Sequence, residues 1–353
     1  MSAPADTPAP IGTVAMMPSQ TPLFRFQKRY AAIWVALVIL IVVSAIVAPR
    51  SLLPGTLAAV VPLAAFLAIA SAGEAIVIMS RGIDLSIPSI VALASTILLG
   101  FSGGSDDGMT GAIVAALGFA AVVGLANGLL VAVLELNALI VTLAVGAITS
   151  GITLWYRESL PAESRVPTAL ADWGGSRFLG LNVSAWVAIV LLVLLTVVLR
   201  MSTIGRRFSA AGANPRAAWI AGINVRAYQI AAFTTAGFLY GIVGILVSAF
   251  IRNPTLLVGD PYLLAPIAAA VLGGTAISGG MGSMIAVGCA ALFLTQLIQM
   301  LKILGLSTAF QFIIFGVAIA LGMAIAEVRP SQIGQFRNWL AQRLRLDPVR
   351  PRS

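Results

Sequence analysis

The chain has 353 residues, of which 59% are hydrophobic and 9% are charged, and its formal net charge is +9. Most of its length has no polar face to present to water, which excludes an ordinary water-soluble domain. The positive charge calls for no nucleic-acid partner, because basic residues gathered on one side of a membrane protein are a topology signal and attract anionic membrane lipid.

The N-terminal segment 1–29 is rich in Pro, Ala, Ser and Thr. This composition is typical of disorder, and the segment is too polar and too long before the first apolar stretch to be a cleaved signal peptide. We therefore expect a disordered cytoplasmic tail, followed by a polytopic transmembrane domain over residues 30–326 that keeps its first helix.

Ten apolar stretches follow one another within this domain: 31–48, 57–79, 87–101, 111–134, 138–156, 183–199, 230–251, 262–277, 285–301 and 306–326. A backbone in lipid must satisfy its own hydrogen bonds, and no stretch alternates with a two-residue period, so the sequence predicts an all-α membrane protein. The third and eighth stretches are short, and each adjoins a glycine-rich break. Such interrupted helices often line a pathway through the membrane.

The basic residues are unevenly distributed when the loops are assigned alternately to the two sides of the membrane. With the N-terminus inside, 15 of the 21 Lys and Arg residues fall on the cytoplasmic side and 6 on the other. This excess indicates ten spans and two cytoplasmic termini. Segment 157–182 is then an external loop, whereas segment 200–226 and the tail 327–353 are cytoplasmic. Apolar residues at helical spacing predict an interfacial amphipathic helix in that tail.

Two carboxylates lie in or next to the second apolar stretch. Glu74 falls inside it, and Asp84 follows it directly. A carboxylate at membrane depth is costly and usually faces a pathway or a partner group, so for Glu74 a pathway role and a structural hydrogen bond are equally open. Asp84 or Ser86 could instead cap the next helix, and Arg81 could pair with Asp84.

Segment 200–226 carries five arginines and no acidic residue. Within it, Asn214 suits a helix N-cap, Pro215 the first helical position and Gly222 the C-terminal end. We therefore predict a helix of about two turns on the cytoplasmic membrane surface. A small rigid helix in that position is suited to docking a partner protein.

The glycine-rich run 273–283 ends without the Gly-Lys-Ser/Thr of a phosphate loop and lacks the third glycine of a dinucleotide fingerprint. We interpret it as a tight turn that allows close helix packing. The sequence has no histidine and a single cysteine, which excludes histidine-based triads and the usual zinc sites. We therefore expect a non-catalytic chain that binds no cofactor or metal.

Four segments, in this order, are similar to the permease subunits of bacterial ATP-binding-cassette importers of the ribose, xylose, arabinose and galactose type. They are 82–86 (Gly-Ile-Asp-Leu-Ser), 126–130 with 139–143, 212–224, and 268–283. The resemblance implies a type II importer-like permease of ten helices in the bacterial inner membrane. It also implies a second permease copy or paralogue, cytoplasmic ATPase subunits that bind ATP and Mg²⁺, and a periplasmic sugar-binding protein. For segment 157–182 two interpretations stay open, a docking surface for that binding protein and a solvated loop.

The same resemblance assigns roles to individual residues. The ATPase-coupling segment comprises Asn214, Pro215, Arg216, Ala217, Ala218, Gly222, Ile223 and Asn224. Candidates for the pathway and its gate are Glu74, Gly82, Asp84, Ser86, Asn127, Thr142, Gly273, Gly274, Gly279 and Gly280. Arg216, Pro88 and Met281 depart from the family pattern, which usually has an acidic residue, a glycine and a basic residue there.

The implied mechanism is alternating access, in which closure of the ATPase subunits moves the coupling helices and the helix bundle opens toward the other side. Two other functions remain open at this point. A branched-chain amino acid permease shares a similar coupling segment, and an ion-coupled secondary transporter would need no ATPase.

Overall fold

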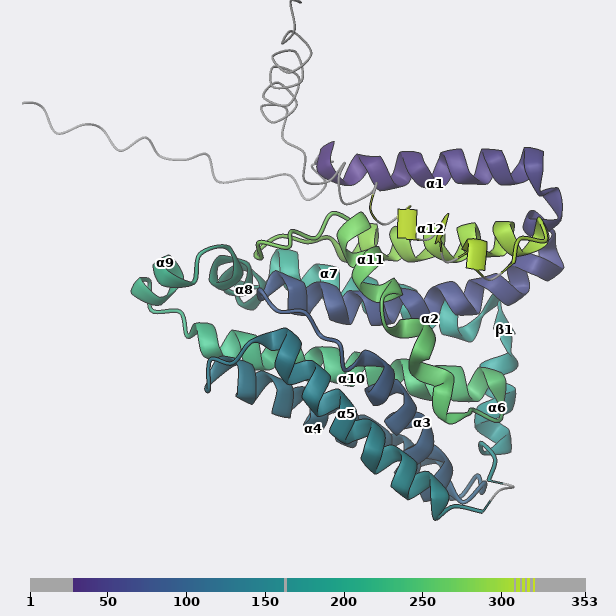
Figure 1. The fold of residues 1–353 in the computed structure, drawn as a ribbon, viewed down its shortest axis with the longest axis horizontal. Coiled ribbons are helices and arrows are strands. Elements are labelled where there is room, and N and C mark those ends of the chain that lie inside the picture. Colours follow the sequence, from purple (N-terminus) through teal and green to yellow (C-terminus); the bar gives the residue numbers. More distant parts are fainter. Residues whose placement is uncertain are drawn as a thin grey trace, which may run out of the picture.

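The computed structural model describes residues 28–161 and 164–307, with scattered positions between 309 and 320. In chain order the elements are α1 (Lys28–Val47), η1 (Pro49–Leu52), α2 (Pro54–Met79), α3 (Ile87–Ser102), α4 (Met109–Ala132), α5 (Ala138–Glu158), α6 (Thr168–Gly175), β1 (Arg177–Phe178), β2 (Leu181–Asn182), α7 (Val183–Met201), α8 (Thr203–Ala213), α9 (Pro215–Ile220), α10 (Val225–Ile251), η2 (Leu256–Tyr262), α11 (Ala265–Leu272) and α12 (Met284–Ile303). Figure 1 shows them as a helical bundle with one short β-hairpin.

The all-α membrane architecture is confirmed. Within the described residues, seven helices are long and apolar enough to cross a membrane, namely α1, α2, α4, α5, α7, α10 and α12. The two expected interruptions are also present. The third expected span is the short helix α3, and the eighth is broken into η2, α11 and a non-helical loop.

Some expectations fall outside the described part of the chain. These are the N-terminal tail up to residue 27, most of the tenth span 306–326, and the amphipathic tail 327–353. Lys28 and Arg29, which we expected in the N-terminal tail, belong to α1.

Helices α2 and α10 form the centre of the bundle. In α2 every residue from Ala64 to Met79 is buried. Of the most apolar part of α10, 67% is buried, compared with 17% for the same part of α7. Since α2 is enclosed on all sides, any polar group it carries at depth must find its partner inside the protein.

Glycines bring α10 and α4 unusually close together. A Cβ added at Gly237 would lie 2.9 Å from Cα of Gly124, and one added at Gly128 would lie 2.9 Å from Cα of Ile230. Lipid gives apolar helices little hydrophobic reason to associate, so close backbone packing of this kind is what holds them together. The α4–α10 pair is therefore a rigid part of the bundle.

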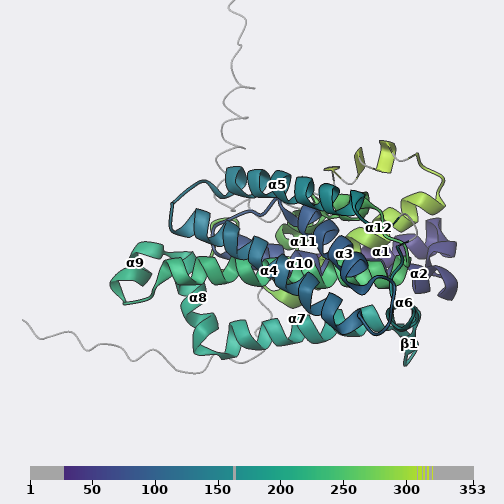
Figure 2. The ribbon, with the colours of Figure 1, turned by 90° about the horizontal axis from the view of Figure 1, so that it is seen from below.

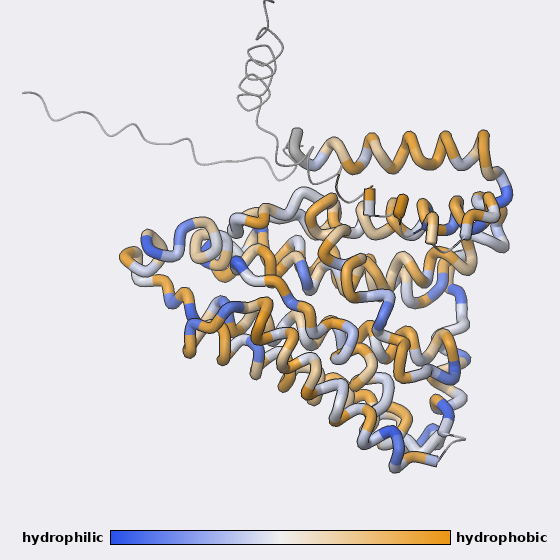
Figure 3. The backbone as a smooth tube through the Cα atoms, in the orientation of Figure 1, coloured by the Kyte–Doolittle hydropathy of each residue, from blue (hydrophilic) through white to orange (hydrophobic). Residues whose placement is uncertain are grey.

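The polar segments lie at two opposite ends of this bundle. Figure 3 shows hydrophilic residues gathered around α8 and α9 at one end and around α6 and β1 at the other. In Figures 1 and 2 alike, α9 projects at the extreme of its end. Segments 200–226 and 157–182 therefore face opposite ways, as the charge distribution predicts.

The described residues of segment 157–182 include regular structure, whereas a solvated loop was one of our two interpretations. It contains α6 and the antiparallel hairpin of β1 and β2. Leu170 and Ala171 of α6 are buried, and Asp172 forms a 2.9 Å ion pair with Arg252 at the end of α10. Apolar contacts therefore hold α6 against the bundle.

Candidate functional site

The segment 200–226 forms two short helices, although we predicted one. Asn214 is extended, with φ −148°, so it ends α8 and begins α9. Its side-chain oxygen accepts a hydrogen bond from the Ala217 N–H at 3.1 Å, and Pro215 follows as the first residue of α9. The predicted N-cap and proline position are both confirmed.

The end of α9 is also as predicted. Gly222 has φ +77°, a conformation that glycine adopts without steric cost. The Gly222 N–H donates to the Trp219 carbonyl and the Ile223 N–H to the Ala218 carbonyl, each at 2.9 Å. This pair of bonds is a Schellman motif, which ends the helix sharply. Asn224 then caps α10 by accepting from the Ala227 N–H at 3.1 Å.

Two large apolar side chains of α9 are exposed at the end of the bundle. Trp219 is 74% exposed and Ile220 is 80% exposed, and Arg216 beside them is exposed as well. We did not single out either apolar residue from the sequence, although large apolar residues inside a short, cation-rich surface helix are an available signal. A projecting helix with exposed apolar side chains is suited to bind a protein groove.

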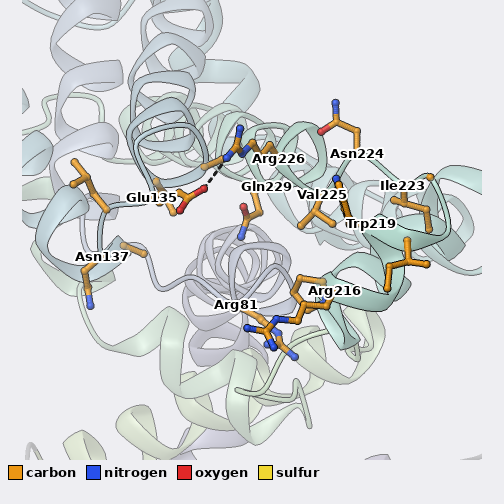
Figure 4. A pocket seen from close by; sticks show the side chains of 17 residues that line it. Arg81, Glu135, Asn137, Arg216, Trp219, Ile223, Asn224, Val225, Arg226 and Gln229 are labelled. Atoms are coloured by element: carbon orange, nitrogen blue, oxygen red, sulfur yellow. Dashed lines mark hydrogen bonds and ion pairs between the residues drawn. The ribbon is translucent and has the colours of Figure 1, made fainter.

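A groove of about 1,370 Å³ lies beside α9. Figure 4 shows α9 and the start of α10 on one side of it and Glu135 and Asn137, from the segment after α4, on the other. Arg226 and Glu135 form a 2.6 Å ion pair across it, with their side chains 61% and 72% exposed. An ion pair this exposed contributes little stability and can open easily.

A buried polar network lies deeper in the bundle, around Glu74 of α2. Its carboxylate accepts hydrogen bonds from the Tyr240 hydroxyl of α10 at 3.2 Å and from the Asp84 N–H at 3.3 Å. Glu74, Asp84 and Tyr240 are all fully buried. The structure shows these hydrogen-bond partners for Glu74, and its pathway role stays a prediction. Tyr240 gave no signal in the sequence, because an aromatic residue in an apolar span is ordinary.

The network continues from Asp84 to α4. The Asp84 carboxylate accepts from the Ser86 N–H at 2.8 Å and from the Ser86 hydroxyl at 2.5 Å. The Asn127 amide then donates to the Ser86 hydroxyl oxygen at 2.9 Å. Ser86 is the N-cap residue of α3 but makes no side-chain cap bond, so it is Asp84 that holds the N–H at the start of that helix.

Thr142 connects the same segment to α5. Its hydroxyl accepts from the Leu85 N–H at 3.0 Å and lies 2.9 Å from the Ala138 carbonyl, to which it donates. The segment between α2 and α3 is therefore tied by hydrogen bonds to α4 and α5, and through Glu74 to α10. Five of our pathway candidates meet here, namely Glu74, Asp84, Ser86, Asn127 and Thr142.

Two acceptor atoms of this network have no partner among the described residues, Oδ2 of Asp84 and Oδ1 of Asn127. Asp84 lies in the connection between two helices, where burial raises its pKa to about 6 while the two bonds from Ser86 lower it. Each of these two acceptors can accept a further hydrogen bond from another group.

Arg81 does not pair with Asp84, so the pairing we considered is wrong. Its guanidinium turns to α8, where Nε donates to the Gly212 carbonyl and Nη2 to the Ala213 carbonyl, each at 2.7 Å. Asp84 points into the protein, away from this contact. The reason is that the last carbonyls of a helix carry partial negative charge and lack helical partners, so a forked cation satisfies two of them together.

The glycine-rich run 273–283 is a turn, as we interpreted it. Gly274, Gly279 and Gly280 have positive φ, and a Cβ added at Gly273 would lie 2.7 Å from Cα of Val287 in α12. These four glycines do not reach the polar network. Gly279 and Gly280 instead lie against the end of α8, and Gly82 packs against Phe233.

No group of three or more His, Cys, Asp or Glu side chains that could hold a metal ion occurs among the described residues. The described residues thus present an exposed surface helix, α9, and a buried polar network.

Comparison with known proteins gives a consistent set of relatives. A family described as "branched-chain amino acid transport system / permease component" matches residues 56–324. Ribose import permease protein RbsC of Escherichia coli K12 is 30% identical over 295 residues, which cover 82% of this chain and 91% of that protein. The protein of the same name from Bacillus subtilis 168 is 30% identical over 293 residues, covering 83% and 91%.

A third relative is the autoinducer 2 import system permease protein LsrC of E. coli K12/DH10B. It is 32% identical over 277 residues, which cover 76% of this chain and 78% of that protein. No solved structure matches the chain. The similarity to all three relatives covers most of both chains.

Proposed function

The chain belongs to the branched-chain amino acid transport system / permease component family, and from this premise we propose that it is the membrane-spanning subunit of an ATP-binding-cassette importer for a monosaccharide or related polyol. The observation that carries the proposal is α9, a capped helix that presents Trp219 and Ile220 to solvent at the end of the bundle. A transporter that supplied its own driving force would have no use for such a surface.

The choice of substrate class rests on the relatives. Two are named for ribose import and one for autoinducer 2 import, and the two ribose permeases align over 91% of their length. The family description names branched-chain amino acids, but no named relative above transports them. A sugar is therefore favoured, and the branched-chain amino acid alternative is not.

In this proposal α9 docks in a groove of a cytoplasmic ATPase subunit, which binds ATP and Mg²⁺, and both chain termini lie on that side of the inner membrane. A second copy or a paralogue completes the pathway. Segment 157–182, at the opposite end of the bundle, faces a periplasmic binding protein that delivers the substrate. The chain itself hydrolyses nothing and moves between inward-open and outward-open states.

The polar network is the proposed gate. It joins α2, α4, α5 and α10 through short side chains, and two of its acceptors lack partners. A sugar hydroxyl could exchange with such groups without leaving a buried charge bare.

The direct test is reconstitution of the chain in liposomes with the ATPase subunit that co-purifies with it and the matching binding protein. ATP-dependent uptake is measured with ribose, xylose, arabinose and galactose, and with leucine as the amino acid control. The proposal predicts uptake of one or more sugars and none of leucine. Uptake driven by an ion gradient in the absence of ATP would contradict it.

A further inference from the structure

The end of α8 meets two other segments at one junction, formed by Met79 at the end of α2, Arg81 just after it, Gly212 and Ala213 of α8, and Gly280 of the turn before α12. The Gly280 N–H donates to the Met79 carbonyl at 2.8 Å. Arg81 closes the other side of the junction through its two bonds to α8. We call this set of five residues the α8 junction.

The backbones in the α8 junction touch. A Cβ added at Gly280 would lie 2.6 Å from the amide nitrogen of Ala213, and one added at Gly212 would lie 2.7 Å from the amide nitrogen of Gly280 and would also overlap the Met79 carbonyl oxygen. With no side chain between them, the end of α8 cannot shift toward these segments without pushing them, because backbone atoms in contact do not compress.

Arg81 forms the hydrogen bonds that attach the segment after α2 to the end of α8. The backbone contact can push the segment after α2 when α8 moves toward it. Hydrogen bonds are also needed to pull that segment back when α8 moves away. Arg81 has φ +70°, an uncommon conformation for a residue with a side chain, and from it the guanidinium reaches both terminal carbonyls of α8. A residue held in such a conformation away from the protein core is often there for a functional reason.

The other side of the α8 junction leads into the polar network. Arg81 is three residues before Asp84. Phe233 packs on Gly82 between them, the Thr142 hydroxyl lies 3.4 Å from the Ile83 carbonyl, and Glu74 accepts from the Asp84 N–H. Helix α9 follows α8 after the single residue Asn214, so a displacement of α9 acts directly on the end of α8. A displacement of α9 thus has a continuous path to the network.

The backbone that connects α9 to α10 provides a second path for movement. Helix α9 leads through residues 221–224 directly into α10, which carries Tyr240. The path through α10 reaches Glu74 from one side, and the path through the α8 junction reaches Asp84 from the other. Both paths must move together for the network to rearrange as one unit.

We propose that Arg81 is the positioning residue that transmits movement of α8 and α9 to the segment carrying Asp84 and Ser86, so that the gate follows the ATPase in both directions. This inference rests on the proposed function. It assigns Arg81 a mechanical role, in which it touches neither substrate nor nucleotide.

The test uses the complete complex in liposomes, with the imported sugar and ATP hydrolysis measured together. Arg81→Gly removes the guanidinium and suits the positive φ, so it separates the bonds from the backbone conformation. We expect Arg81→Gly to bind the ATPase as wild type does but to import about fivefold less sugar per ATP, because both partly exposed hydrogen bonds from Arg81 to α8 are lost. Arg81→Lys, which keeps the charge but not the fork, should recover part of this loss.

A second pair of variants tests the backbone contact. Gly280→Ala and Gly305→Ala both place a side chain at positive φ, +80° and +73°, but only the former meets a neighbour, since nothing lies within 4 Å of a Cβ at Gly305. We expect Gly280→Ala to lower import per ATP and Gly305→Ala to leave it unchanged.

The outcomes distinguish this inference from the proposed function. Wild-type import per ATP in Arg81→Gly, or equal behaviour of Gly280→Ala and Gly305→Ala, would overturn the role of the α8 junction alone. A loss in Arg81→Gly that is explained entirely by weaker ATPase binding would overturn it too, because Arg81 would then be a docking residue. A wild-type complex that shows no ATP-dependent import would overturn both.

Discussion

At the centre of the bundle, Glu74, Asp84 and Tyr240 are polar, fully buried and held by partners within the chain. At the end of the bundle, by contrast, Trp219 and Ile220 are apolar and exposed. Both arrangements reverse the usual preference of their residue types. The difference indicates that the network holds the chain's own helices in place, whereas the surface of α9 serves an association with another chain.

The largest expected effect concerns the polar network. Asp84→Ala removes the acceptor for both the N–H and the hydroxyl of Ser86 and leaves these two donors buried without that acceptor. We expect the purified chain to lose about 3 kcal/mol of unfolding free energy, measured by denaturant titration in detergent micelles.

Asp84→Asn is the matched control, because it keeps a side-chain oxygen in the same position and should cost less than about 1 kcal/mol. Equal losses in the two variants would show that the hydrogen bonds from Ser86 do not stabilise the bundle.

The next largest effect is expected at the exposed surface of α9. Trp219→Ala should weaken binding of the ATPase subunit by about 2 kcal/mol, or some thirtyfold, since large aromatic side chains dominate most protein interfaces. The unfolding free energy of the isolated chain should not change. Affinity is measured by titrating the purified ATPase against the labelled chain.

Trp155 in α5 is the control for this experiment, because it is likewise 74% exposed but lies on a membrane-spanning helix. Trp155→Ala should leave ATPase affinity unchanged. If it weakens binding as much as Trp219→Ala does, the interface is not at α9.

A smaller effect is expected at the end of α9. Gly222→Ala forces a side chain into φ +77° and should destabilise the Schellman motif by about 1 kcal/mol. ATPase affinity should fall about fivefold, because α9 is then less well formed before docking. Gly111→Ala in α4, where nothing lies within 4 Å of the added Cβ, should leave affinity unchanged. A normal affinity in Gly222→Ala would mean that docking does not depend on the sharp helix end.

The smallest effect is expected at the groove beside α9. A double-mutant cycle of Glu135→Ala and Arg226→Ala should give a coupling energy of about 0.5 kcal/mol, since both partners of this ion pair are exposed. Unfolding titrations of the two single variants and the double variant provide the cycle. A coupling energy above about 2 kcal/mol would mean that the groove is closed in the working protein.

Local features could be predicted from the sequence because their causes are local. Asn214, Pro215 and Gly222 define α9 through capping chemistry that depends on adjacent residues only. The interrupted helices were visible as short apolar stretches next to glycines. Asp84, Ser86, Asn127 and Thr142 were pathway candidates through the family resemblance, but spacing alone gives no reason for residues on different helices to converge, so their meeting could not be predicted.

Contacts between distant segments could not be predicted. Arg81 has a carboxylate three residues away in the sequence, yet it binds carbonyls of a helix more than 130 residues further on. Choosing between those partners required the position of α8, which depends on the packing of Gly212 against Met79 and Gly280. The partnership of Tyr240 with Glu74 depends in the same way on the close packing of α10 against α2.

The central claim is that α9 receives the force of an ATPase on the cytoplasmic side. It is tested most directly by placing the photo-crosslinking residue benzoylphenylalanine at position 219 in the intact membrane complex, where it replaces one exposed aromatic side chain with another. We expect a covalent adduct between this chain and the ATPase subunit. Adducts with lipid or with the periplasmic binding protein, and none with the ATPase, would contradict it.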